Sequence, residues 1–123
     1  MKNQLQLVTY EQATMLKKLG FDIETYKYYC DKYPIHGITL NDAYHFGNWN
    51  ESDKNFSAPT VALALKWFRD EKDIEYSIEY GANYFWHIHN ISHENTCDVG
   101  LETYDEAESA LLDELLTILE KQQ

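Results

Sequence analysis

The sequence predicts an α+β fold in which helices cover one face of a small antiparallel sheet. Residues 74–80 alternate apolar and polar side chains, and a glycine-containing turn joins them to a second, largely apolar run at 84–91, which is the pattern of a β-hairpin. The flanking stretches, 58–72 and 104–121, repeat apolar residues at helical spacing. The expected elements are strands near 25–31, 74–80 and 84–91, packed on one face by helices 58–72 and 104–121, with helix 10–19 at an edge.

The composition limits both the size and the partners of this fold. The chain has 123 residues, 44% of them hydrophobic, which predicts a single domain over 1–123. Its 21 acidic and 10 basic residues give a net charge of −11, which disfavours direct binding to nucleic acids and to anionic membranes. The first residues lack the apolar core of a signal peptide, and no apolar run approaches a membrane span of roughly 20 residues. We therefore expect a cytoplasmic protein.

Side chains that cap helices mark the starts of the predicted helices. Thr9 with Gln12 forms a capping box before the first helix, and Thr103 with Glu106 forms one before the third. Ser57 is the expected N-cap of the second helix, because a proline follows it in the first turn.

The register of the hairpin decides where its two histidines point. A three-residue loop at 81–83 pairs Tyr80 with Tyr84, buries the larger apolar set of the return strand and leaves His87 and His89 outside. A two-residue loop would bury both histidines. We expect the three-residue loop, because it buries more apolar surface and places the imidazoles near carboxylates.

Residues 41–56 have neither a helical nor a strand period, and we expect a long loop there that is rich in aromatic residues and asparagine. Two interpretations are open. The aromatic side chains either contact a partner or hold the loop against its own domain. The residues of this segment that are candidates for contact with a partner are Tyr44, Phe46 and Trp49.

Two helices carry more apolar surface than one sheet can cover. Leu63 and Trp67 lie far around helix 58–72 from its main apolar face. The apolar arc of helix 104–121 extends over about half its circumference, whereas one face needs about 100°. The surplus predicts a second neighbour, either in the same chain or in a second copy, so a homodimer through helix 104–121 is one expected assembly. The interaction candidates in that arc are Leu112, Leu116 and Leu119.

The strongest candidate metal site combines His87, His89, His93 and Cys97. Histidines two apart on a strand point the same way, and imidazole and thiolate are zinc ligands. The spacing matches no standard zinc finger, and the alternative is a pair of surface histidines opposite glutamates. We expect no cofactor, with zinc as the alternative. No hydrolase nucleophile motif and no phosphate-binding glycine loop is present, so no catalytic residue is predicted.

Four segments together resemble one group of proteins. They read TYEQA…LKKLGF, SAPTVALALKWFRDEKDIEYSIEY, YFWHIHNI and TYDEAESALLDELLTILE. This set is similar to small uncharacterised proteins of bacteriophages and of prophage-like elements in gut bacteria. The resemblance covers 9–21, 57–91 and 103–121, while 22–56 does not match. It implies an origin in a phage or prophage and a location in the host cytoplasm, and it implies no activity.

These observations favour a non-enzymatic protein-interaction module whose partner is another protein or a second copy. Two alternatives are open. One is an acidic inhibitor that mimics DNA and occupies a basic nucleic-acid-binding site of a host protein. The other is a metal-binding module or enzyme that uses His87 and His89.

Overall fold

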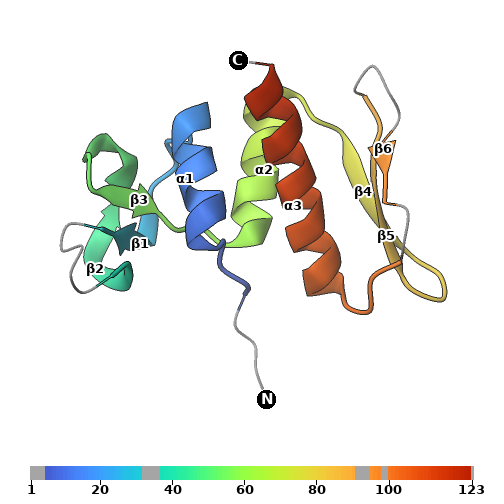
Figure 1. The fold of residues 1–123 in the computed structure, drawn as a ribbon, viewed down its shortest axis with the longest axis horizontal. Coiled ribbons are helices and arrows are strands. Elements are labelled where there is room, and N and C mark those ends of the chain that lie inside the picture. The colour runs from blue at the N-terminus through green and yellow to red at the C-terminus, as the bar shows by residue number, and fades with distance from the viewer. Residues whose placement is uncertain (1–4, 32–36, 91–94, 98–99, 123) are drawn as a thin grey trace.

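The computed structural model describes residues 5–31, 37–90, 95–97 and 100–122. Within these residues, three helices lie between two small sheets (Figure 1), and the predicted α+β class is confirmed. The elements are α1 (Tyr10–Leu19), β1 (Thr25–Cys30), β2 (Thr39–Gly47), the 3-10 helix η2 (Trp49–Glu51), β3 (Asn55–Ser57), α2 (Val61–Lys72), β4 (Tyr76–Tyr80), β5 (Tyr84–Ile88), β6 (Asn95–Thr96) and α3 (Tyr104–Lys121).

The strands form two separate antiparallel sheets, in the orders β2-β1-β3 and β4-β5-β6. The strand predicted near 25–31 exists, but its placement in the sheet of the hairpin is wrong. Residues 28–30 of β1 pair with 39–41 on one side and with 55–57 on the other. Both edges of β1 are therefore occupied, and the hairpin pairs with β6 instead.

The prediction of a long loop over 41–56 is also wrong, because this segment contains most of β2, η2 and the start of β3. β2 carries a large bulge. Thr25 of β1 faces Gly47 and Lys27 faces Asp42, so residues 43–46 all lie opposite Tyr26. A bulge breaks the period of two that identifies a strand in a sequence.

The hairpin has the predicted register. Tyr80 pairs with Tyr84 across a three-residue loop, and Ser77 pairs with His87. Trp86 and Ile88 are consequently buried against the helices. His87 lies on the opposite face of the strand, as expected, and His89, just after β5, contacts Ser77 on that same face.

Helix α1 is central, and its predicted position at an edge is wrong. Its residue Leu16 is fully buried in the hydrophobic core. On one side, the ring of Tyr10 contacts the ring of Phe56 from the first sheet, with centroids 5.4 Å apart. On the other side, Gln12 Nε2 donates a hydrogen bond of 2.8 Å to Asp113 Oδ1 of α3. Two sheets need covering rather than one, which brings α1 into the middle layer (Figure 1).

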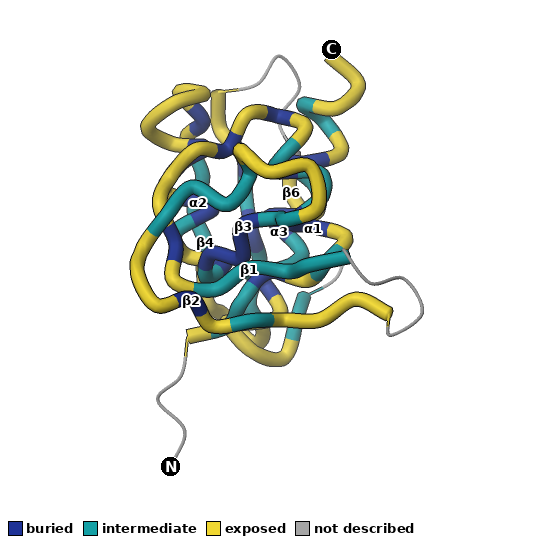
Figure 2. The backbone as a smooth tube through the Cα atoms, turned by 90° about the vertical axis from the view of Figure 1, so that its left-hand side faces the viewer, coloured by how far each residue is buried: buried dark blue, intermediate teal, exposed yellow. Residues whose placement is uncertain are grey.

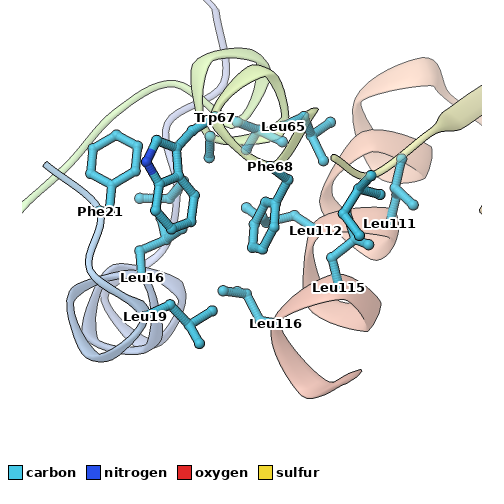
Figure 3. Packing of buried hydrophobic residues seen from close by; sticks show 14 of the residues in the cluster. Leu16, Leu19, Phe21, Leu65, Trp67, Phe68, Leu111, Leu112, Leu115 and Leu116 are labelled. Carbon is cyan, nitrogen blue, oxygen red and sulfur yellow. The ribbon is translucent and has the colours of Figure 1, made fainter. Parts of the chain in front are cut away.

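The broad apolar arc of α3 is covered within the chain. One side of α3 contacts α1 and α2, and the other contacts β4 and β5. Figure 3 shows Leu112 beside Phe68 of α2 and Leu116 directed toward the side of α1. The α3 leucines that are completely buried are Leu111, Leu112, Leu115 and Leu116.

The capping boxes at Thr9 and Thr103 are confirmed. The predicted start of α2 is three residues early. Its N-cap is Thr60, whose Oγ1 accepts a 3.1 Å hydrogen bond from the Leu63 backbone N–H. Ser57 belongs to β3 instead, where it pairs with Tyr28 of β1, and its backbone N–H donates a hydrogen bond to Asn50 Oδ1.

Candidate functional site

Aromatic side chains are exposed on the first sheet, where β2 is an edge strand. Tyr44 of β2 is fully exposed and Phe46 is 63% exposed. Tyr26 of β1 is 43% exposed, and its ring meets that of Phe46 edge-on with centroids 5.5 Å apart. We call Tyr26, Tyr44 and Phe46 the β2 surface. Figure 2 looks onto this sheet and shows β2 exposed over most of its length.

The bulge in β2 explains how these aromatic side chains reach solvent. Ala43, at the start of the bulge, is buried, whereas Tyr44 and Phe46 are turned outward. Bulges commonly redirect side chains next to binding sites and interrupt pairing at a sheet edge. Within the described part of the chain, β1 is the sole strand that pairs with β2, so the other edge of β2 is open to a partner.

A hollow of about 220 Å³ lies beside the β2 surface, between the bulge and the start of α2. Two residues of the β2 surface, Tyr26 and Phe46, form part of its wall. The other lining residues are Leu7, Glu24, Thr25, Lys27, Ala58, Pro59, Thr60 and Leu63. Leu63 was predicted to need a second neighbour, and it is half-buried at this hollow.

The hollow is lined by one acidic residue, Glu24, and one basic residue, Lys27, and they differ in whether another side chain of the protein neutralises them. Glu24 is exposed at its rim. Lys27 also lines the hollow, but its ammonium group forms an ion pair with Asp42 of β2. The carboxylate of Glu24 is therefore the lining charge left to interact with a ligand.

Trp49 was predicted to contact a partner, but it holds η2 onto the first sheet. Its ring stacks on Tyr28 with centroids 4.8 Å apart. Its indole Nε1–H donates a 2.8 Å hydrogen bond to the carbonyl of Thr25, and its backbone N–H donates one of 3.1 Å to Ser57 Oγ. Asn50 adds a bond from Nδ2 to the carbonyl of Phe21. The structure thus assigns Trp49 a part in folding.

Three other interaction candidates belong to the hydrophobic core. Trp67 is only 4% exposed and packs edge-on against Phe21, with ring centroids 5.4 Å apart (Figure 3). Leu112 and Leu116 are completely buried. The prediction that these three residues contact a partner is wrong, because the layer of helices between two sheets buries them. Leu119 is half-buried, and its contact with a partner stays a prediction.

Two of the candidate metal ligands, His87 and His89, lie side by side with ring centroids 6.0 Å apart, and each contacts another residue of the hairpin. His87 Nε2 lies 3.0 Å from Glu79 Oε1, and His89 Nε2 lies 2.8 Å from Ser77 Oγ. Cys97 is on the opposite, core-facing side of the sheet, packed against the hydrophobic core.

The sulfur of Cys97 also has a structural partner, because Cys97 Sγ accepts a 3.2 Å hydrogen bond from the Trp86 backbone N–H. His93 lies outside the described residues. Among the residues that are described, no group of three or more side chains of the metal-binding types could hold an ion.

A cluster of polar side chains lies where α2, β4 and α3 meet. The guanidinium of Arg69 lies over the ring of Tyr76, 4.6 Å from its centroid. Burial raises the pKa of the Tyr76 hydroxyl, and the charge of Arg69 opposes that rise. Burial, together with the charge of Asp105, raises the pKa of the nearby Glu108 carboxyl. These contacts connect three elements of the fold, and they place no nucleophile beside a base.

Sequence reasoning identified Tyr44, Phe46 and Leu63 but missed two parts of the site. Tyr26 was assigned to a packed strand, and Glu24 was given no role. Their proximity to Phe46 follows from the bulge, which brings segments that are distant in sequence to one hollow. No short sequence pattern around Glu24 or Tyr26 indicates that these residues lie near Phe46.

None of the helices in the described ranges is long and apolar enough to cross a membrane. Comparison of the chain with family models, curated proteins and solved structures found no match.

Proposed function

We propose that the protein is a non-enzymatic interaction module that binds a partner protein through the β2 surface. The exposure of Tyr44 and Phe46 on a bulged, open edge strand supports this function. Burying a large apolar or aromatic side chain contributes about 1.5–3 kcal/mol of favourable free energy. Folding leaves most of the surface of these two residues in water, so a partner that covers them gains that free energy. Tyrosine is also enriched among the residues that dominate binding energy in interfaces.

The charge of the chain indicates which partner fits. Two copies would bring together two chains that each carry a net charge of −11, and mutual repulsion opposes that assembly. Two of the three leucines proposed for a homodimer, Leu112 and Leu116, are already covered by the chain itself, and Leu119 is half-buried. We therefore propose a basic partner protein rather than a second copy.

Mimicry of DNA requires the carboxylates to gather on one face. The exposed acidic residues occur on all three helices and in both sheets, so no single element gathers them. Glu11 on α1, Asp42 on β2, Asp70 on α2, Glu79 on β4 and Asp113 on α3 illustrate this scatter. The distribution does not favour mimicry, and a partner that contacts the β2 surface accounts for more of the observations.

The origin in a phage or prophage and the location in the host cytoplasm remain part of the proposal, and both rest on the resemblance of the sequence. The proposed function includes neither a catalysed reaction nor a cofactor. Zinc held by His87 and His89 is left out of the proposal, because the described ranges contain no group of three or more His, Cys, Asp or Glu side chains that could hold an ion.

Affinity capture with three matched baits tests the proposal. The baits are the wild type, the double variant Y44S/F46S and the variant Y80S, and the extract comes from the bacterium that carries the gene. Tyr80 is a suitable control because it is 70% exposed but lies on the second sheet. We expect a protein that the wild type and Y80S retain and that Y44S/F46S loses, with enrichment reduced at least about tenfold. Equal retention of every protein by all three baits would contradict the proposed surface.

A further inference from the structure

We propose that the hollow beside the β2 surface is an anchor site for one large apolar side chain of the partner, with a neighbouring Lys or Arg of the partner paired to Glu24. This inference rests on the proposed function and specifies the partner's chemistry. The β2 surface supplies the contact area, and the hollow supplies selectivity for the segment that binds.

The walls of the hollow are held in place before any ligand arrives. The segment before α1 lies beside the start of α2, where Val8 N–H donates to the Pro59 carbonyl at 3.0 Å and Val61 N–H donates to the Gln6 carbonyl at 2.8 Å. Ala58 N–H donates to the carbonyl of Lys27 at 3.0 Å, which fixes the same segment against β1. A site formed in advance binds without a further cost of ordering its walls.

The size of the hollow suits a single side chain. Its volume of about 220 Å³ exceeds the roughly 150 Å³ of a cavity that accepts benzene. It is smaller than the roughly 300–1,000 Å³ typical of pockets for drug-sized ligands and cofactors. Leu63, Phe46 and Pro59 give it apolar walls. A phenylalanine, leucine or methionine that projects from a partner chain matches both the volume and the lining.

The negative charge of Glu24 next to the hollow favours a basic residue beside the apolar side chain of the partner. The Lys27 ammonium is occupied by Asp42, while Glu24 is exposed at the rim. The chain as a whole carries a charge of −11, so an acidic segment is repelled both locally and at long range. A basic residue beside the apolar anchor therefore binds best.

A titration followed by nuclear magnetic resonance tests the anchor with defined probes. The probes are three capped tripeptides: lysine–phenylalanine–lysine, glutamate–phenylalanine–glutamate and lysine–serine–lysine. We expect the first to shift the backbone amide signals of Leu63, Phe46 and Tyr26 with a Kd on the order of 1 mM. The other two should bind at least about tenfold more weakly. Equal binding of the serine peptide would overturn the anchor, equal binding of the glutamate peptide would overturn the role of Glu24, and no shift at these residues would overturn both.

Two variants locate the binding in the hollow. Leu63→Trp fills it, and Ala62→Trp is the matched control, because Ala62 is exposed on the same helix and does not line the hollow. We expect Leu63→Trp to lose at least about tenfold in affinity for the first peptide and Ala62→Trp to keep it. Glu24→Lys, at an exposed position that does not disturb packing, should reverse the preference between the lysine and glutamate peptides. Unchanged preference in Glu24→Lys would contradict the inference even if Leu63→Trp failed to fold.

The same variants separate this inference from the proposed function. Used as bait for affinity capture, a Leu63→Trp protein that keeps the partner while Y44S/F46S loses it would refute the anchor and leave the β2 surface as the binding site. Retention of the partner by Y44S/F46S would refute the proposed function itself.

Discussion

Replacement of Leu112 by alanine separates a core role for α3 from a role in dimerisation. Leu112 is 0% exposed and lies beside Phe68 of α2 (Figure 3). Leucine-to-alanine changes at such sites cost about 2.7–5.0 kcal/mol, so a loss of about 3 kcal/mol is expected. An unfolding entropy of about 2.1 cal/mol/K per residue gives about 0.26 kcal/mol/K for 123 residues. The melting temperature should therefore fall by about 12 °C.

Urea and thermal unfolding measure this loss, and repeating both at several protein concentrations shows whether it depends on association. Leu40→Ala is the matched control, because Leu40 undergoes the same chemical change at a position that is 47% exposed. It should lose less than about 1 kcal/mol. A loss below about 1 kcal/mol for Leu112→Ala would contradict its place in the core, and a loss that varies with protein concentration would show that a second copy helps to cover it.

Three further predictions concern other parts of the fold. Trp49→Phe removes the indole donor to the Thr25 carbonyl while keeping a ring over the sheet, and urea unfolding should show a loss of about 1 kcal/mol; an unchanged midpoint would argue against a structural role for that bond. Equimolar zinc should leave the melting temperature unchanged, because His87 and Cys97 lie on opposite faces of the second sheet; a rise that is lost in His87→Gln would mean that a metal site forms. The raised pKa of Glu108 means that the folded state holds this proton more tightly than the unfolded chain, so the ionised carboxyl lowers stability at neutral pH and this cost disappears as the pH falls below the usual range of a glutamate. Glu108→Gln should therefore be more stable than the wild type at about pH 7, with the difference shrinking toward about pH 4, and an advantage that grows on acidification would contradict the sign.

The parts of the fold that sequence reasoning predicted correctly depend on local chemistry. The two capping boxes are visible within four residues each, and the hairpin register follows from the volumes of Trp86 and Ile88. Without the capping boxes, backbone N–H groups at the helix starts would lack hydrogen-bond acceptors. In the other hairpin register, large apolar side chains would lie in water.

The parts that were missed depend on pairing between distant segments. The bulge opposite Tyr26 breaks the alternation of β2, so its sequence resembles a loop. The wide apolar arc of α3 does indicate a second neighbour, but a sequence pattern is the same whether that neighbour is another helix of the chain or another copy. The same ambiguity affected Trp67, whose neighbour is Phe21, 46 positions earlier in the chain.

Hydrogen–deuterium exchange of the captured complex measures where the partner binds. If the β2 surface and its hollow are the binding site, the backbone amides of residues 39–47, 58 and 60–63 should exchange more slowly in the complex than in the free protein. The hairpin at 76–88 serves as the internal reference and should exchange at the same rate in both. Slower exchange confined to the hairpin or to α3, with 39–47 unchanged, would contradict the proposed binding surface.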